Sequence, residues 1–255
     1  MCGIVGFLSA EGDADGNLLA RMCARIVHRG PDEEGRHVQG ALAMGMRRLA
    51  IIDIAGGQQP IANEDGTIEV VFNGEIFNFR ELRAELELAG HHFATNSDTE
   101  VIVHAYEQWG DDALLRFNGM FAFALWDGRR QRLLLARDRM GKKPIYWHLS
   151  SHGLLWGSEI KSMLEAPWVE RAIDPVALHH YLTLQYTPDP LTAFKGIFRL
   201  PAAHKLVVEA GRTQRDEVEG AIDLIQACPN ITLLLNKVQI SAPNTFGAYT
   251  ASYSS

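Results

Sequence analysis

The sequence predicts an α+β protein, a four-layer α-β-β-α sandwich of two antiparallel sheets. From residue 120 to residue 158 the strand-like runs follow one another as hairpins, with turn signals at Asp127–Gly128 and around Gly153. Helical patterns are grouped between strands and do not alternate with them, which argues against a parallel sheet. The run 120–126, MFAFALW, is apolar at even and odd positions alike, as in a sheet covered on both faces.

The elements follow in order. A short apolar stretch at 2–9 predicts a buried strand that ends in a turn. Residues 17–28 predict an amphipathic helix, because apolar side chains recur at helical spacing. Further strands are expected at 41–46, 48–54, 68–77, 120–128, 132–138 and 144–158.

Two more helices have recognisable ends. Asn78 and Ser97 are each followed three residues later by a glutamate, as in a capping box. Gly90 and Gly110 stand where these helices should stop.

Composition narrows the class of protein. The chain has 255 residues, 47% of them hydrophobic, and a net charge of −7 without a block of like charges, so neither a nucleic-acid groove nor a polybasic membrane anchor is expected. Apolar runs are too short to span a bilayer, and the N-terminus lacks a leader pattern. Three widely spaced cysteines fit neither a disulfide framework nor a zinc site, so we expect a reducing, cytoplasmic location.

The histidines argue against a metal site. His91 with His92, and His179 with His180, are adjacent pairs, and adjacent residues do not share one helix face as i, i+4 ligands do. No metal is therefore expected.

Cys2 is the first candidate catalytic residue. Removal of Met1 would leave the thiol and a free α-amino group, with a pKa of about 7.7–8.0, on one residue, so that nucleophile and base come together. Taken alone, Cys2 reads equally as a small buried hydrophobe at the start of a strand.

Asn73 and Gly74 are the second candidate. They follow a strand, where a side-chain amide and a backbone N–H can stabilise the oxyanion of a tetrahedral intermediate. An Asn-Gly pair is otherwise most often a tight turn.

Six stretches in this order carry a resemblance to a known family: MCGIVGF, HRGPD, RLAIID, NGEIFN, SDTE and RDRMGKKPIYW. Together they resemble the N-terminal glutaminase domain of glutamine-hydrolysing asparagine synthetase, a class II glutamine amidotransferase of the N-terminal-nucleophile hydrolase type. The resemblance covers residues 2–208.

The resemblance implies a role for each matched residue. Cys2 would attack the glutamine amide, its own amino group would pass the proton to the leaving ammonia, and Asn73 with the Gly74 N–H would form the oxyanion hole. The substrate would be held by Arg48 at its α-carboxylate, by Glu75 and Asp98 at its α-ammonium, and by the backbone of Leu49, Ala50, Ile51 and Ile52.

Each binding residue has a plainer interpretation. Arg48 reads equally as a solvated surface charge, Asp98 as a carboxylate stabilised by a helix dipole, and Glu75 as a turn residue. One cation, two anions, an amide and a nucleophile are nevertheless the set that a zwitterionic amide substrate requires.

The resemblance stops near residue 214. Residues 215–255 form an unrelated short tail, with an expected helix over 216–227, an apolar strand ending at 239 and a disordered end. The ATP-dependent synthetase domain, with its S-G-G-x-D-S-like pyrophosphate loop, is not found in the sequence.

The expected function is hydrolysis of L-glutamine to glutamate and ammonia through a Cys2 thioester, for asparagine-type amide synthesis. No cofactor is needed for this half-reaction, whereas ATP and magnesium enter only with a separate synthetase domain or subunit that accepts the ammonia. The alternative is an inactive remnant or fusion product that binds glutamine or a partner protein without turnover. The sequence leaves the oligomeric state open.

Overall fold

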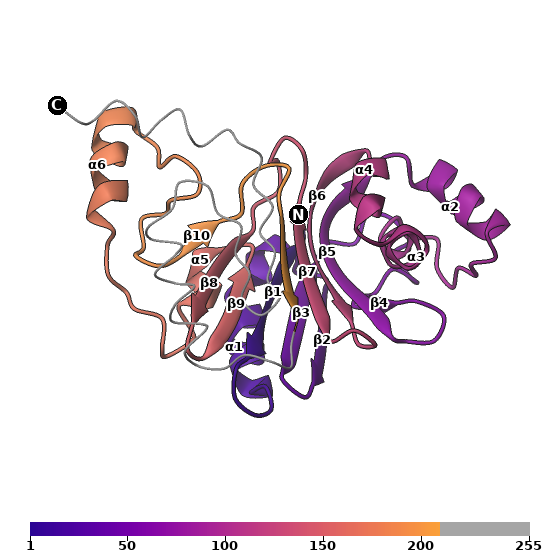
Figure 1. The fold of residues 1–255 in the computed structure, drawn as a ribbon, viewed down its shortest axis with the longest axis horizontal. Helices are drawn as coiled ribbons and strands as arrows, with labels where there is room; N and C mark the ends of the chain where they lie inside the picture. Colours follow the sequence, from indigo (N-terminus) through magenta and orange to yellow (C-terminus); the bar gives the residue numbers. More distant parts are fainter. Residues whose placement is uncertain (210–255) are drawn as a thin grey trace.

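The structure, a computed structural model, describes residues 1–209 and contains two antiparallel sheets (Figure 1). The first sheet, in the order β10-β8-β9-β1-β3-β2, comprises β1 Gly3–Ser9, β2 Glu33–Gln39, β3 Leu42–Arg48, β8 Tyr146–Ser150, β9 Gly153–Gly157 and β10 Phe198–Arg199. The second sheet, in the order β11-β7-β6-β5-β4, comprises β4 Ile61–Ala62, β5 Ile68–Ile76, β6 Gly119–Asp127, β7 Arg132–Arg137 and β11 Lys205–Glu209.

Helices cover the outer faces of both sheets. The α-helices are α1 Gly16–Ala24, α2 Phe79–Leu88, α3 Glu100–Trp109, α4 Ala113–Arg116, α5 Ile160–Met163 and α6 Pro175–Leu184, and the 3-10 helices are Val27–Arg29 and Gly110–Asp112. In Figure 1, α2, α3 and α4 lie beyond the second sheet, whereas α6 lies at the opposite end of the molecule.

Three apolar clusters separate the four layers. The central cluster lies between the sheets and includes Trp126 and Trp156. A second cluster packs α2 and α3 on the outer face of the second sheet, and a third packs α1 and α5 on the first sheet. The predicted four-layer sandwich is therefore confirmed.

The apolar run in β6 shows why both faces of the sheets are buried. Residues Phe121–Asp127 are all buried, with alternate side chains entering the central cluster and the cluster beneath α3. This is the sequence signature of a sheet enclosed by two layers.

The strand expected at 48–54 is wrong. β3 ends at Arg48, and residues 49–56 form turns in which Asp53 has a φ of 48°. The guanidinium of Arg48 donates to the carbonyl oxygens of Ile52 (2.9 Å) and Asp53 (2.7 Å), so the segment curls around its own arginine and does not pair with a strand.

The helices at 78 and 97 form without the expected capping boxes. The Asn78 side chain bonds to Asn118 and Arg116, and the carboxylate of Glu100 accepts from the N–H groups of Ala94 and Thr95. Asn78 is thus held by a distant segment, whereas Glu100 bonds to the chain just before its own helix. Gly90 (φ 100°) and Gly110 (φ 58°) do follow the helix ends as expected.

Two further points complete the fold. The helix, strand and disorder expected after residue 215 lie outside the described residues. Over residues 1–209, no helix is long and apolar enough to cross a membrane.

Candidate active site

A cavity of about 150 Å³ lies beside Cys2, where the start of β1 faces the second sheet. It is lined by the predicted residues Cys2, Arg48, Leu49, Ile51, Ile52, Asn73, Gly74, Glu75 and Asp98. Ala50 was also predicted, but it does not line the cavity; its N–H donates to the carboxylate of Asp32 at 2.9 Å. The fold thus brings together four segments that are far apart in the sequence.

The backbone of Cys2 is fixed by a partly buried ion pair. The Nε of Arg29 donates to the Cys2 carbonyl oxygen (2.9 Å), and its Nη1 lies 3.0 Å from Glu159 Oε1. The thiol of Cys2 lies 3.7 Å from the carbonyl oxygen of Leu49, at the cavity wall. Arg29 and Glu159 therefore position the nucleophile candidate without lining the cavity themselves.

Cys23 is a different kind of cysteine. It lies on α1 and is fully buried, and burial raises the pKa of its thiol to about 12. A thiol of this kind is inert at neutral pH, because the thiolate is the reactive form. Cys228 lies outside the described residues.

Asn73 carries the most informative polar group of the site. It lies on β5, is 1% exposed, and neither its Oδ1 nor its Nδ2 has a hydrogen-bond partner among the described residues. Leaving both ends of a buried amide unpaired costs about 1–3 kcal/mol per group, so such a residue calls for an explanation. A ligand in the cavity that accepts from Nδ2 supplies one.

Gly74 is required by close packing. A Cβ at this position would lie 2.2 Å from the carbonyl oxygen of Met120 on the paired strand. Only glycine keeps the backbone beside Asn73 in register with β6.

Arg48 is buried, and its charge is already engaged. It is 3% exposed, and it donates to Glu33 Oε2 at 2.7 Å as well as to the carbonyl oxygens of the 52–54 segment. The plainer interpretation of a solvated surface charge is therefore wrong. Its bonds show that it shapes the loop that forms one wall of the cavity.

Asp98 is a buried carboxyl group at the cavity. It is 4% exposed, and its Oδ2 accepts from the Ile76 N–H at 2.9 Å. Burial raises the pKa of Asp98 to about 6, and the nearby charge of Glu75 also raises it. The hydrogen bond from Ile76 lowers the pKa but does not outweigh burial. Within residues 1–209, no cationic side chain forms an ion pair with it. A positively charged ligand group would supply the missing counter-charge.

Sequence reasoning missed Lys143, which is 6% exposed and lines the cavity. Its Nζ lies 3.3 Å from the Met1 Sδ. The loop before it is held by the carboxylate of Asp138, which accepts from the N–H groups of Met140, Lys142 and Lys143. Lys143 lies in RDRMGKKPIYW, one of the six stretches that carry the family resemblance, but the resemblance assigns it no role.

Comparison with known proteins identifies the family. The model of the glutamine amidotransferase domain matches residues 1–218. The chain belongs to the glutamine amidotransferase family. More closely, it is a class II glutamine amidotransferase domain related to the N-terminal domain of glutamine-hydrolysing asparagine synthetase.

Curated relatives of this amidotransferase domain are asparagine synthetases. The chain is 38% identical over 211 residues to asparagine synthetase [glutamine-hydrolyzing] 3 of Bacillus subtilis, covering 81% of this chain and 34% of the relative. It is 42% identical over 166 residues to an asparagine synthetase [glutamine-hydrolyzing] of Sandersonia aurantiaca, covering 64% and 31%. The chain thus spans about a third of the length of these relatives.

Solved structures agree on the fold. The glutamine phosphoribosylpyrophosphate amidotransferase of B. subtilis superposes with a TM-score of 0.57 at 18% identity, over 82% of this chain and 47% of that one. At this identity the likeness concerns the two-sheet architecture of the amidotransferase domain.

Proposed function

We propose that this amidotransferase domain hydrolyses L-glutamine to glutamate and ammonia through a thioester on Cys2. The observation that carries the proposal is the buried, unpaired amide of Asn73, which lines the same cavity as the Cys2 thiol. A hydrogen-bond donor that has no partner among residues 1–209 is available to a developing oxyanion.

The chemistry begins at Cys2. With Met1 removed, its free amino group accepts the thiol proton, and Sγ attacks the side-chain amide carbon of glutamine. The carbonyl oxygen becomes an oxyanion, which the Asn73 amide and the Gly74 N–H stabilise. Collapse of this intermediate breaks the C–N bond, and the proton leaves with ammonia. Water then attacks the thioester, releases glutamate and restores the thiol.

The charged ends of glutamine account for the remaining residues. Asp98, assisted by Glu75, binds the α-ammonium and thereby gains the cation that it lacks. Arg48 binds the α-carboxylate while it holds the loop around Leu49, Ala50, Ile51 and Ile52. Burial of these groups strengthens their electrostatic contacts with the substrate.

The second half of the proposal concerns the fate of ammonia. Glutamine hydrolysis uses no cofactor, and a separate synthetase domain or subunit, with ATP and magnesium, would consume the ammonia for asparagine-type amide synthesis. A cytoplasmic location fits, since both described cysteines are free thiols.

A glutaminase assay coupled to covalent labelling tests the enzymatic proposal. We expect ammonia release from glutamine, and a glutamine-mimicking electrophile should modify the Cys2 peptide and inhibit turnover. Labelling of Cys23 or Cys228 with Cys2 unmodified would contradict the proposal.

One observation keeps a second candidate function in view. Met1 itself lines the cavity, and while it remains attached Cys2 has no free amino group. A chain that retains Met1 would bind glutamine or a partner without turnover. Intact mass decides: loss of one methionine supports the enzyme, and retention together with absent turnover supports the binding protein.

A further inference from the structure

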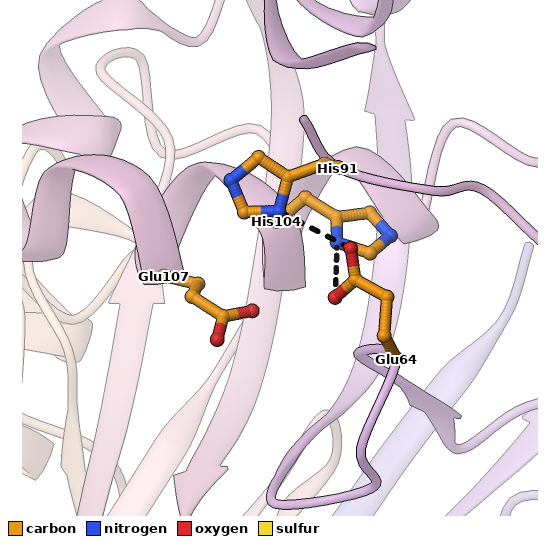
Figure 2. Close-up of side chains that lie close together, drawn as sticks. All are labelled: Glu64, His91, His104 and Glu107. Atoms are coloured by element: carbon orange, nitrogen blue, oxygen red, sulfur yellow. Dashed lines mark ion pairs between the residues drawn. The ribbon is translucent and has the colours of Figure 1, made fainter. Parts of the chain in front are cut away.

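A cluster of two histidines and two glutamates lies on the outer side of the second sheet, away from the residues that line the cavity. Glu64 comes from the turn between β4 and β5, His91 from the segment between α2 and α3, and His104 and Glu107 from α3. One side-chain donor atom from each residue lies within 4.8 Å of the others (Figure 2). The spacing of neighbouring histidines does not reveal this cluster, because His104 lies on a different element from His91.

Both imidazole rings direct their Nδ1 atom towards the carboxylate of Glu64. His104 Nδ1 lies 3.3 Å from Glu64 Oε2, and His91 Nδ1 lies 3.3 Å from Glu64 Oε1, as Figure 2 shows. His104 is 0% exposed, and its Nδ1 makes no hydrogen bond within the described part of the chain. A buried nitrogen aimed at the centre of an acidic cluster without a hydrogen bond points to a missing ligand.

Outer partners orient both rings. The Nε2 of His104 lies 3.4 Å from Glu100 Oε1, and the Nε2 of His91 lies 3.2 Å from Gln108 Oε1. If each Nε2 donates its proton to these oxygens, the lone pair of each Nδ1 faces the cluster. Metal-binding histidines are typically held in this way, with the distal N–H donated to a carboxylate or carbonyl oxygen.

We propose that Glu64, His91, His104 and Glu107 bind one divalent transition-metal ion, with Zn²⁺ as the best match. Two imidazole nitrogens and two carboxylate oxygens suit zinc, whereas magnesium and calcium prefer oxygen ligands alone. Tetrahedral bonds of about 2.0–2.1 Å place ligand atoms about 3.3–3.4 Å apart. The two histidine–Glu64 distances of 3.3 Å are of this size, and because they involve different oxygens of one carboxylate, one of them would be a ligand–ligand distance in a four-coordinate site.

The fourth ligand needs only a side-chain movement. Glu107 follows His104 by three residues on α3, so both side chains lie on one helix face. Its carboxylate accepts from Asn63 Nδ2 at 3.0 Å and lies 3.5 Å from Arg129 Nη1, and the side chain is 25% exposed. Turning towards the ion would exchange these two contacts for a bond to the metal.

The proposed role of the ion is structural. It would join the β4–β5 turn, the segment before α3 and α3 itself, none of which is joined by a disulfide within residues 1–209. The same segment carries Ser97, Asp98 and Thr99 into the glutamine cavity. Metal binding would therefore stiffen one wall of the cavity without taking part in glutamine hydrolysis.

The test is zinc binding by the EDTA-treated full-length chain, in competition with a chromophoric chelator. A Cys2→Ser background is used, because an N-terminal cysteine is itself a chelator. We expect one equivalent of Zn²⁺ to bind. His91→Ala and Glu64→Gln should each weaken binding at least tenfold to a hundredfold, since loss of even an outer partner costs that much.

His92→Ala is the matched control, because it removes the neighbouring exposed imidazole, which lies outside the cluster. Zinc at a hundredfold excess over the wild-type dissociation constant should raise Tm by about 5–10 °C in the control, and by about half as much or less in His91→Ala. Equal zinc affinity in His91→Ala and His92→Ala would overturn the proposal and leave protonated-imidazole ion pairs as the role of the cluster. A folded, metal-free chain that binds no zinc would overturn it as well.

Discussion

The two walls of the glutamine cavity differ in how their polar groups are satisfied. On the wall from the first sheet, Cys2 is fixed by Arg29, which is itself paired with Glu159. On the wall from the second sheet, Asn73 has an unpaired amide and Asp98 has no cationic partner within residues 1–209. The first wall is held by contacts within the described residues, whereas under the proposed function glutamine supplies the partners of the second.

The difference identifies which wall performs which task. A nucleophile must be held in position before substrate arrives, so its supports are internal. Asn73 has hydrogen-bonding capacity, and Asp98 a carboxyl group, that no side chain within residues 1–209 satisfies, and this costs stability in the resting protein. Unpaired buried groups therefore mark the binding wall.

The largest expected effect is at Cys2, on the cavity wall from the first sheet. Cys2→Ala should reduce glutamine hydrolysis to the background rate, because no other described thiol lines the cavity. Glutamine binding, measured by calorimetry, should persist, since Asp98 and Arg48 grip parts that do not react. Cys23→Ala is the control and should retain turnover, although it removes a buried side chain and lowers Tm. Loss of binding in Cys2→Ala would show that the two walls are not separable.

The next effect tests the oxyanion hole. Asn73→Ala should lower kcat by about 10²–10³-fold with a modest change in KM, because this contact strengthens in the transition state. Since the amide is unpaired in the resting protein, the same change should leave Tm nearly unchanged or higher. A rise in KM alone would move Asn73 from the oxyanion hole to ground-state binding.

Arg48 should give a mixed result. Arg48→Ala should raise the KM for glutamine roughly 10–100-fold through the lost contact with the α-carboxylate. It should also lower the free energy of unfolding by about 1–3 kcal/mol, because Glu33 and the 52–54 carbonyl groups lose their buried donor. Arg36→Ala, which removes only an exposed pair with Glu34, is the control. A kcat effect alone, at unchanged KM, would contradict the assigned role.

Asp98 should make stability depend on pH. Its pKa is raised from 3.8 to about 6, so between these values the native carboxyl keeps a proton that the unfolded chain has lost. Unfolding then releases a proton, and stability falls as pH rises through this window, by about 3 kcal/mol from this group. Urea unfolding of wild type and Asp98→Asn across pH 4–7 measures this contribution of Asp98 to the free energy of unfolding, because the variant should lack it.

Glutamine affinity should show the opposite trend. Binding the α-ammonium requires the ionised carboxylate, so KM should be about tenfold higher at pH 5 than at pH 7 if the group titrates near pH 6. If the wild-type KM did not change between pH 5 and pH 7 while stability still fell, Asp98 would not be a substrate-binding residue.

Sequence alone determined the elements whose signal is local. The hairpins from 120 to 158, the glycines that follow α2 and α3, and the apolar run of β6 each depend on residues close in the chain. The roles of Cys2 and of the Asn73–Gly74 pair come instead from the family resemblance, because each residue type alone has a plainer interpretation. Asn73 and Gly74 are expected after a strand or in a turn, but they lie within β5, opposite Ala122 and Phe121.

Tertiary structure decided the features that depend on partners distant in the chain. Residues 49–56 have the apolar content of a strand, yet the buried Arg48 bonds their carbonyl groups and makes them a cavity wall. His91 and His104 come together only because α2 and α3 pack on one sheet face. The spacing of apolar residues shows which side of a segment packs on the core. Which charged side chains meet depends on where packing places distant segments, and the local sequence does not determine that placement.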